Sequence, residues 1–330
     1  MSNIKKNASS LVENEECIYQ IIDNNKNNTN FAENQENNMD CRIYSLKTFM
    51  ELDLPKSNII LDPIITERSL AMLYAYRGVG KSFFAMSLAL AVATGDKFLR
   101  WKAPNPQKVL YVDGEMPANM LQDRFSKISN LNETGDYTEN LEIFATDLQP
   151  FSTINISNTE MQKEITAIIE KKGIKLLILD NLSTLTTLDE LDAASWNVIQ
   201  EWLITLRKKG VAVIIVHHAG KSGNQRGISK REDILDLVIN LRNKTSSNNE
   251  EEVSLNGKCQ VVFEKNRNLS KKQISNFGIE LVDIFDDKIA WIDVYAQVQQ
   301  LKAEGISCRE IEKITGISKS RVAEICKLDN

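Results

Sequence analysis

Two kinds of hydrophobic pattern alternate over most of this chain of 330 residues. Short, almost continuously apolar runs predict buried strands at Ser69–Tyr74, Val109–Val112, Leu141–Phe144, Leu176–Leu179 and Val211–Val216. Longer runs between them predict helices at Lys81–Thr94, Ala118–Leu131, Thr159–Lys171 and Ala193–Lys209, three of which are followed by glycine. Strands that are apolar on both faces and alternate with helices predict an α/β fold. We expect a doubly wound, mainly parallel sheet with helices on both faces.

The pattern changes after Val216. Shorter apolar runs then follow one another and predict further strands, partly antiparallel, at Val238–Leu241, Gln260–Glu264, Gly278–Val282 and Ile289–Ile292. The end of the chain predicts three short helices at Val298–Glu304, Cys308–Ile314 and Lys319–Leu328. Three such helices with a glycine between the last two are typical of a helix-turn-helix unit, and a protein-interaction unit is the alternative.

The beginning of the chain differs from the rest in composition. Residues 1–40 contain eleven asparagines and few apolar side chains. Such a segment buries too little surface to offset its ordering entropy, so a disordered tail is expected. The predicted domains are therefore this tail at 1–40, an α/β domain at 41–293 and a helix-turn-helix domain at 294–330.

Composition narrows the functional classes only a little. The formal net charge of -5 argues against a basic coat for nucleic acid but leaves room for a local basic patch. The five cysteines are scattered without a CxxC pair and are expected to be free thiols, and the two adjacent histidines make a zinc site improbable. No apolar run is long enough for a membrane helix or has the form of a signal peptide, so a cytoplasmic location is expected.

A phosphate-binding loop is predicted between the first strand and the first helix. The segment Ala75-Tyr76-Arg77-Gly78-Val79-Gly80-Lys81-Ser82, followed by Phe83, matches G-x-x-x-x-G-K-[ST] except that alanine stands in the first position. Backbone N–H groups and the helix N-terminus would face the phosphates of ATP. Lys81 would reach the β- and γ-phosphates and Ser82 would bind Mg²⁺. An ordinary glycine-containing turn is the alternative.

Carboxylates follow two of the predicted strands. Asp180 ends an apolar strand in the Walker B pattern and is expected to bind water on Mg²⁺. Asp113 and Glu115 follow the strand at Val109–Val112. Hydrolysis needs a base that orients and deprotonates water, and Glu115 is the candidate, with Asp113 as the second possibility. A merely solvated Glu115 is the alternative.

Both histidines of the chain, His217 and His218, end the strand at Val211–Val216. Adjacent residues of a strand face opposite sides, so only one of them can face a nucleotide and sense its γ-phosphate. A histidine that caps the strand end is the alternative.

With these motifs the chain resembles the RecA-like ATPase superfamily, and most closely the hexameric replicative helicases of the plasmid RepA type and the related AAA-25 ATPases. The resemblance runs from about Leu54 to Asp293. It rests on Ala75–Ser82, Tyr111–Pro117, Leu176–Leu185, Val216–Arg231 and Phe263–Arg267. It implies ATP and Mg²⁺ as cofactors, Glu115 as the catalytic glutamate and His218 as the sensor.

The resemblance also implies an arginine finger, with a nearby lysine, that acts across a subunit interface. Arg267 and Lys265 match its place in the chain. If they act in this way, the protein hydrolyses ATP as a homo-oligomer, for which the family suggests a hexamer. A solvated strand end is the alternative for both side chains.

Two basic segments are candidates for contacts with DNA. Residues 219–231 form a glycine-containing loop without acidic residues, and its cations are Lys221, Arg226, Lys230 and Arg231. In the resembled ring ATPases such a loop grips single-stranded DNA in a central channel, and Asn181–Asp192 would be its companion. In the C-terminal unit, the start of the last helix carries Ser318, Lys319 and Arg321, where duplex DNA would be read.

Two functions remain open from the sequence. The first is an ATP-driven ring motor on DNA, such as the replicative helicase of a plasmid or mobile element. The second is a DNA-bound regulator that ATP switches without strand separation. A strand-exchange protein of the RecA type fits the resemblance less well.

Overall fold

The computed structural model of the chain describes residues 42–128, 138–151, 153–186, 193–219, 232–243, 258–270, 273–284, 287–315 and 317–326. The chain divides into two compact units, Met1–Pro55 and Lys56–Asn330. The described part of the first unit contains the short helix α2 (Leu46–Met50), whose N-terminus is capped by the Ser45 hydroxyl. The asparagine-rich tail predicted for residues 1–40 lies outside the described residues.

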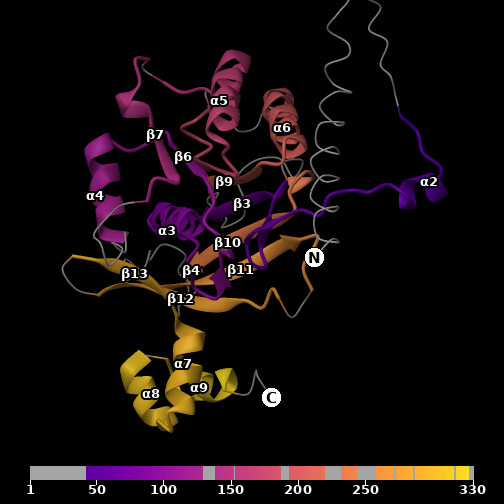
Figure 1. Cartoon of the computed structure of the whole chain (residues 1–330). Helices are drawn as coiled ribbons and strands as arrows, with labels where there is room; N and C mark the ends of the chain where they lie inside the picture. The colour runs from indigo at the N-terminus through magenta and orange to yellow at the C-terminus, as the bar shows by residue number, and fades with distance from the viewer. Residues whose placement is uncertain are drawn as a thin grey trace, which may run out of the picture. The chain divides into compact units, whose positions relative to one another are not determined.

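The described residues of the second unit form a nine-stranded sheet in the order β13-β12-β11-β10-β3-β9-β8-β6-β7 (Figure 1). Six neighbouring strands are parallel: β3 (Leu70–Ala75), β6 (Val109–Asp113), β7 (Leu141–Ala145), β8 (Leu176–Asp180), β9 (Ala212–His218) and β10 (Leu237–Asn243). Three antiparallel strands extend them: β11 (Lys258–Asn266), β12 (Phe277–Asp283) and β13 (Ile289–Asp293). The prediction of a mainly parallel α/β sheet with a partly antiparallel extension is confirmed.

Helices cover both faces of the sheet because alternate residues of each strand enter different cores. On one face, Leu73, Tyr111 and Ile178 pack with α3 (Lys81–Thr94). On the other face, Met72, Leu110 and Leu177 pack with α5 (Thr159–Lys172) and α6 (Ala193–Lys208), which lie together in Figure 1. The doubly wound arrangement follows from this period of two.

The helix α3 is buried from several sides. Its Phe84 ring lies 5.9 Å from the Trp291 ring of β13 and 4.8 Å from Phe98, measured between centroids. Phe98 belongs to the small hairpin of β4 (Lys97–Phe98) and β5 (Trp101–Lys102). The hairpin, the strands β1 (Ile59–Leu61) and β2 (Ile65–Thr66), and the 3-10 turn η1 (Thr146–Leu148) were not predicted, because two or three residues show no periodicity.

Three helices end the second unit: α7 (Val294–Ala303), α8 (Cys308–Thr315) and α9 (Lys319–Ile325). They enclose a small core of Val298, Ile311, Val322 and Ile325. The first helix begins four residues before the predicted start because the Asp293 carboxylate caps it by accepting from the Tyr295 and Ala296 N–H groups. The prediction of three short helices is confirmed, apart from this earlier start, and a DNA-binding helix-turn-helix domain stays a prediction.

The described part of the chain includes no helix with the length and apolar character of a membrane span. Its three cysteines, Cys259, Cys308 and Cys326, are free thiols, while Cys17 and Cys41 lie outside the described residues.

Candidate active site

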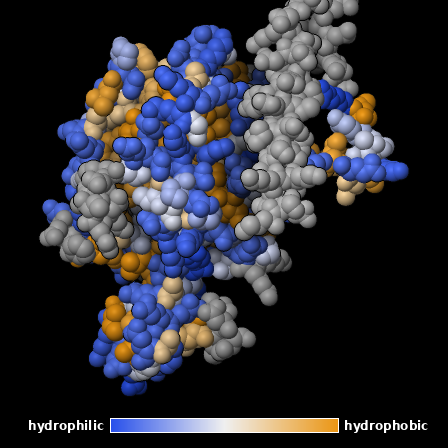
Figure 2. Space-filling model, in the orientation of Figure 1, coloured by the Kyte–Doolittle hydropathy of each residue, from blue (hydrophilic) through white to orange (hydrophobic). Residues whose placement is uncertain are grey.

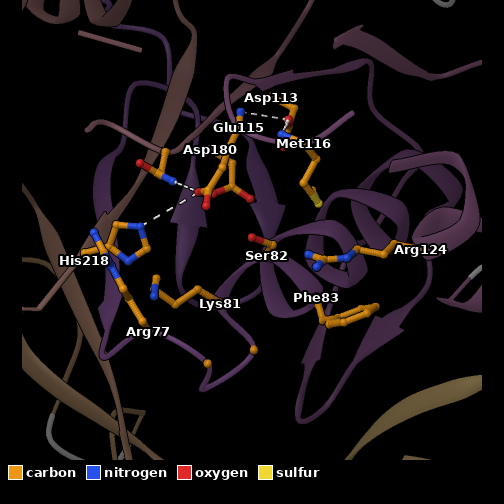
Figure 3. A pocket seen from close by; sticks show the side chains of 13 residues that line it. Arg77, Lys81, Ser82, Phe83, Asp113, Glu115, Met116, Arg124, Asp180 and His218 are labelled. Atoms are coloured by element: carbon orange, nitrogen blue, oxygen red, sulfur yellow. Dashed lines mark hydrogen bonds and ion pairs between the residues drawn. The ribbon is translucent and has the colours of Figure 1, made fainter. Parts of the chain in front are cut away.

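A cavity of about 440 Å³ lies where four parallel strands end and α3 begins (Figure 3). It is lined by the phosphate-loop residues Arg77, Gly78, Gly80, Lys81, Ser82 and Phe83, and by Asp113, Glu115, Met116, Arg124, Asp180, Asn181 and His218. These residues come from distant parts of the chain. The parallel register brings them together because it aligns Asp113 with Asp180 and Ala75 with His218. Ligands of open α/β sheets bind at this carboxyl edge.

The phosphate loop has the backbone that its motif requires. Gly78 and Gly80 have φ angles of 83° and 96°, in the left-handed region that favours glycine. A Cβ atom on Gly80 would also lie 3.0 Å from the Trp291 ring. Ala75 is the last residue of β3, where an extended backbone suits any residue. The alanine in the first motif position therefore costs no strain.

Lys81 is buried at the first turn of α3 and donates to the carbonyl oxygens of Ala75, at 3.2 Å, and Tyr76, at 3.0 Å. Burial lowers the pKa of Lys81 to about 8, while the charges of Asp180 and Glu115 act in the opposite direction. A phosphate beside Lys81 would add a further negative charge and stabilise the ammonium form. The cavity therefore contains a preformed cation whose desolvation an anionic ligand would offset.

Asp180 lies at the end of β8 and is almost fully buried. Its carboxylate accepts hydrogen bonds from the hydroxyl groups of Tyr111 and Ser82. Burial raises the pKa of Asp180 above its ordinary value, against these two hydrogen bonds and the charge of Lys81. Ser82 and Asp180, the two predicted Mg²⁺ residues, are thus in direct contact.

Asp113 and Glu115 lie in different surroundings. Asp113 is buried, and one of its oxygens accepts from the N–H groups of Glu115, at 3.1 Å, and Met116, at 2.7 Å. Its other oxygen has no hydrogen-bond partner among the described residues. The side chain of Glu115 is 56% exposed and reaches into the cavity. Glu115 is therefore the carboxylate that a water molecule in the cavity can reach.

The Glu115 carboxylate accepts a hydrogen bond from the side-chain amide of Asn181 and lies 3.9 Å from Nε2 of His218 (Figure 3). His218 lines the cavity, whereas its neighbour His217 is fully buried outside the cavity lining. The two adjacent histidines therefore separate as the strand geometry predicts, with His218 on the side of Glu115.

Residues 46–224 match the AAA_25 family model, described as an AAA domain. The match covers more than half of the chain. The protein belongs to the AAA_25 family. It is a RecA-like P-loop ATPase, as the sequence motifs predicted.

The chain is similar in structure to a KaiC-like protein from the hyperthermophilic archaeon Pyrococcus horikoshii OT3, with 17% sequence identity and a TM-score of 0.49. That similarity covers 70% of this chain and 93% of the other. No curated protein matches the chain.

Membership of the AAA_25 family implies a nucleotide and usually Mg²⁺. The residues present fit the ion, because Ser82 and Asp180 offer adjacent hydroxyl and carboxylate oxygens at the phosphate loop. Ser82 would bind Mg²⁺ directly and Asp180 would hold it through water. Bound there, the ion neutralises negative charge on the phosphates of the nucleotide.

Four residues of this AAA_25 site were not singled out from the sequence. Tyr111 and Asn181 hold Asp180 and Glu115 by hydrogen bonds. Arg124 of α4 (Ala118–Ile128) lines the cavity with Met116, and its guanidinium lies 5.0 Å from the centroid of the Phe83 ring. An arginine on the outer face of an amphipathic helix gives no signal in the sequence. Arg124 nevertheless adds a third cation to the phosphate-loop cavity, beside Arg77 and Lys81.

Lys265 and Arg267 lie at the end of the sheet where the parallel strands begin, opposite the carboxyl ends that surround the cavity. Asn266, between them, pairs with Leu237, and Leu237 pairs with Ala71 at the beginning of β3. The phosphate loop begins four residues after Ala71, which is about 13 Å along the strand. Lys265 and Arg267 donate to the carbonyl oxygens of Glu232 and Asp233. Neither lines the cavity of its own chain.

The candidate DNA contacts are only partly described. Lys221, Arg226, Lys230 and Arg231 lie outside the described residues, as do residues 187–192 of the companion loop. Ser318 and Lys319 are exposed at the start of α9. Arg321 donates to the Tyr295 hydroxyl at 2.6 Å and lies over its ring. This guanidinium is thus engaged within the chain.

Asp113→Asn should make the protein more stable at neutral pH. Burial raises the pKa of Asp113 from 3.8 to about 6, so the unfolded chain loses this proton first. The stability that the protonated carboxyl contributes is complete below pH 3.8 and is lost as the pH rises through about 6. A shift of about two units corresponds to about 3 kcal/mol. Asparagine keeps the oxygen that accepts from Glu115 and Met116.

Urea unfolding checks this prediction. The variant should exceed the wild type by about 1–3 kcal/mol above pH 7, and the difference should vanish near pH 4. Asp123→Asn, at an exposed carboxylate that pairs with Lys127, is the matched control and should show no such trend. A difference that does not change with pH would contradict a buried, protonated Asp113.

Proposed function

We propose that this chain is an ATP-driven ring motor on DNA, of the kind that includes the replicative helicases of plasmids and mobile elements. The observation that carries the proposal is the position of Glu115. Its carboxylate is exposed in the cavity, held by Asn181, and faces His218 across 3.9 Å. A strand-end carboxylate that water can reach, beside a buried lysine and a buried aspartate, suits the hydrolysis of a bound triphosphate.

Each residue then has a defined task. Lys81 and the N–H groups of the loop hold the phosphates, and Ser82 and Asp180 hold Mg²⁺. Glu115 orients a water molecule and accepts its proton as the oxygen attacks the γ-phosphate. His218, one side chain away, donates a hydrogen bond to the γ-phosphate and so distinguishes ATP from ADP.

The proposal includes a homo-oligomer, for which a hexamer is the expected form. Lys265 and Arg267 lie at the edge of the sheet remote from their own cavity, so they serve a site only if a neighbouring chain presents one to them. An arginine supplied from a neighbour would stabilise charge in the transition state.

The basic loop after β9 supports DNA as the partner. His218 ends β9, and the segment with Lys221, Arg226, Lys230 and Arg231 follows almost at once. A change in the contacts of His218 would therefore reach this basic segment, the candidate for binding the phosphates of DNA, through one or two residues of backbone. Single-stranded DNA in the centre of a ring is the expected ligand of this loop.

An ATP-switched regulator without strand separation is the second candidate. It depends on duplex binding by α9. Arg321, one of the three DNA-contact candidates there, is engaged with Tyr295, which leaves Lys319 as the exposed cation among the three. This contact favours the motor over the regulator.

ATP turnover with and without DNA tests the proposal. We expect single-stranded DNA to increase turnover several-fold more than duplex DNA does, with ATP-dependent strand displacement by a multimeric species. Native mass should be measured on the same samples. Slow turnover that DNA does not change, together with tight binding to one duplex sequence, would overturn the motor and support the regulator.

A further inference from the structure

A polar cluster lies inside the second unit, away from the phosphate-loop cavity. The face of this unit drawn in Figure 2 is largely hydrophilic, whereas its interior is apolar, so buried polar side chains call for an explanation. Tyr74 of β3 and Asn240 of β10 are 1% and 3% exposed, and they lie opposite each other in the parallel pair. Tyr74 belongs to the core that packs with α5 and α6.

The cluster ties β3 to β11 across the strand between them. The Tyr74 hydroxyl donates to the carboxylate of Glu264 in β11. The side-chain amide of Asn240, in the intervening β10, donates to the Tyr74 hydroxyl at 3.1 Å and to the Glu264 carboxylate at 2.8 Å. Side chains of three neighbouring strands therefore meet at one carboxylate.

A bulge in β11 brings Glu264 to this position. The consecutive β10 residues Val238 and Ile239 pair with Lys265 and Phe263, so Glu264 is the extra residue between them. Bulges of this kind redirect a side chain. Phe263 packs against the core on the α3 face of the sheet. Residues 263 and 264 therefore fasten β11 on both faces.

The cluster keeps one protonation state over the ordinary pH range. Burial raises the pKa of Tyr74 far above its usual value, and the hydrogen bond to Glu264 acts in the same direction. Burial also acts to raise the pKa of Glu264, but hydrogen bonds from Tyr74, Asn240 and Arg242 outweigh it, and that pKa is lowered. The Arg242 guanidinium donates to the carboxylate at 2.7 Å. A charged acceptor with three donors forms a strong and fixed connection.

This connection lies between two functional segments of the chain. Tyr74 directly precedes Ala75, at which the phosphate loop begins. Glu264 directly precedes Lys265 and lies three residues before Arg267, about 10 Å along an extended strand. A hydrogen-bonded polar cluster constrains the relative position of strands more strictly than apolar contact does, at a cost in desolvation.

We infer that Glu264, held by Tyr74 and Asn240, is a positioning residue for the arginine finger that each chain offers to its neighbour. It fastens β11 to β3, so that Arg267 extends from a fixed place in the sheet. This precision matters because a displacement of about 1 Å in a group that stabilises a transition state can cost about 10²-fold in rate. The inference rests on the proposed function for the action of Arg267 between chains, and it adds the residues that position it.

Mixed rings test the inference because the two chains have different tasks in them. Arg267→Ala chains supply an intact cavity, and Lys81→Ala chains supply only the finger. Glu264→Gln or Tyr74→Phe is then added to one of the two chains at a time. In the chain that supplies the finger, either change should lower the recovered turnover about 10-fold or more, with the KM for ATP unchanged. In the chain with the intact cavity, either change should have no effect, because the finger of that chain is already absent.

Glu280→Gln is the matched control. The Glu280 side chain is 22% exposed, against 25% for Glu264, and it pairs with Lys258 at the other end of β11. This control should leave the recovered turnover unchanged in either chain. Native mass, measured on the same mixtures, should also be unchanged by all three substitutions.

The possible failures are distinct. Full recovery with a finger chain that carries Glu264→Gln would refute the inference alone. Equal losses from both placements, a loss with Glu280→Gln, or a loss of assembly would show a general loosening of the fold and would refute it too. No recovery in the unmodified pair of chains would refute the finger between chains, which belongs to the proposed function, and the positioning role with it.

Discussion

Arg267→Ala should lower the turnover of ATP by about 10³-fold or more, which is the effect of losing an arginine finger. The expected loss is large because the finger stabilises charge that develops on the γ-phosphate only in the transition state. Nucleotide affinity should change little, since Arg267 lies at the far edge of the sheet from its own phosphate loop. Steady-state turnover and ATP binding, measured on the same preparation, check both parts.

Mixing two inactive variants shows whether Arg267 acts between chains. Lys81→Ala should not bind nucleotide, but its Arg267 is intact. Arg267→Ala has an intact cavity. Mixed rings therefore contain some interfaces that unite an intact loop with an intact arginine, and these should recover part of the activity. Arg267 acting within its own chain predicts no recovery at all.

A loss of turnover in Arg267→Ala that came from local loss of structure is distinguished by a second variant. Arg267 also anchors the segment before β10. Its guanidinium donates to the Asp233 carbonyl, and its backbone N–H donates to the Asp236 carbonyl. Arg207 anchors the same segment, by donating to the Ile234 carbonyl and the Asp236 carboxylate. Arg207→Ala should therefore loosen this edge without removing the finger. Equal losses of turnover in the two variants would point to the fold of the segment.

Glu115→Gln should bind ATP with the affinity of the wild type and hydrolyse it about 10²- to 10⁴-fold more slowly. Glutamine has nearly the same shape, and its amide oxygen still accepts from Asn181, so the cavity should keep its form. The variant lacks a base for the attacking water. Single-turnover hydrolysis and equilibrium binding of ATP separate the two effects.

Two further variants make this test specific. Asp113→Asn removes the carboxylate at the end of β6 and should retain hydrolysis, because Asp113 is buried and one of its oxygens accepts from the N–H groups of Glu115 and Met116. Glu142→Gln changes a surface carboxylate that pairs with Lys172 and should behave as the wild type. Normal turnover by Glu115→Gln, with loss of turnover in Asp113→Asn, would transfer the role of base to Asp113.

Much of the sheet was predictable because its signals are local. The nine main strands are apolar runs, and the observed β8 (Leu176–Asp180) differs from its predicted range by one residue. Helices α3 and α5 end at Gly95 and Gly173, which have φ angles of 78° and 67°. A glycine is visible in the sequence wherever a helix stops in this way. The phosphate loop, Asp180 and Glu115 are recognisable because each follows a strand.

Other features depend on contacts between distant parts of the chain. Trp291 packs against Gly80 because three antiparallel strands bring β13 onto α3, and no local pattern encodes that return. Arg124 reaches the cavity only because α4 packs beside the phosphate loop. The position of Arg321 near the start of the last helix predicts a contact with DNA, yet its guanidinium lies over the Tyr295 ring.

The sequence by itself determined the class of fold, the order of strands and helices along the chain, and the position of the candidate phosphate loop. These follow from hydrophobic period, glycine positions and motif spacing, which act over a few residues. Only the tertiary structure placed His218, which the resemblance already favoured as the sensor, beside Glu115, and placed Arg267 at the end of the strands remote from its own cavity. Strand pairing and register decide both, and they depend on residues more than a hundred positions apart.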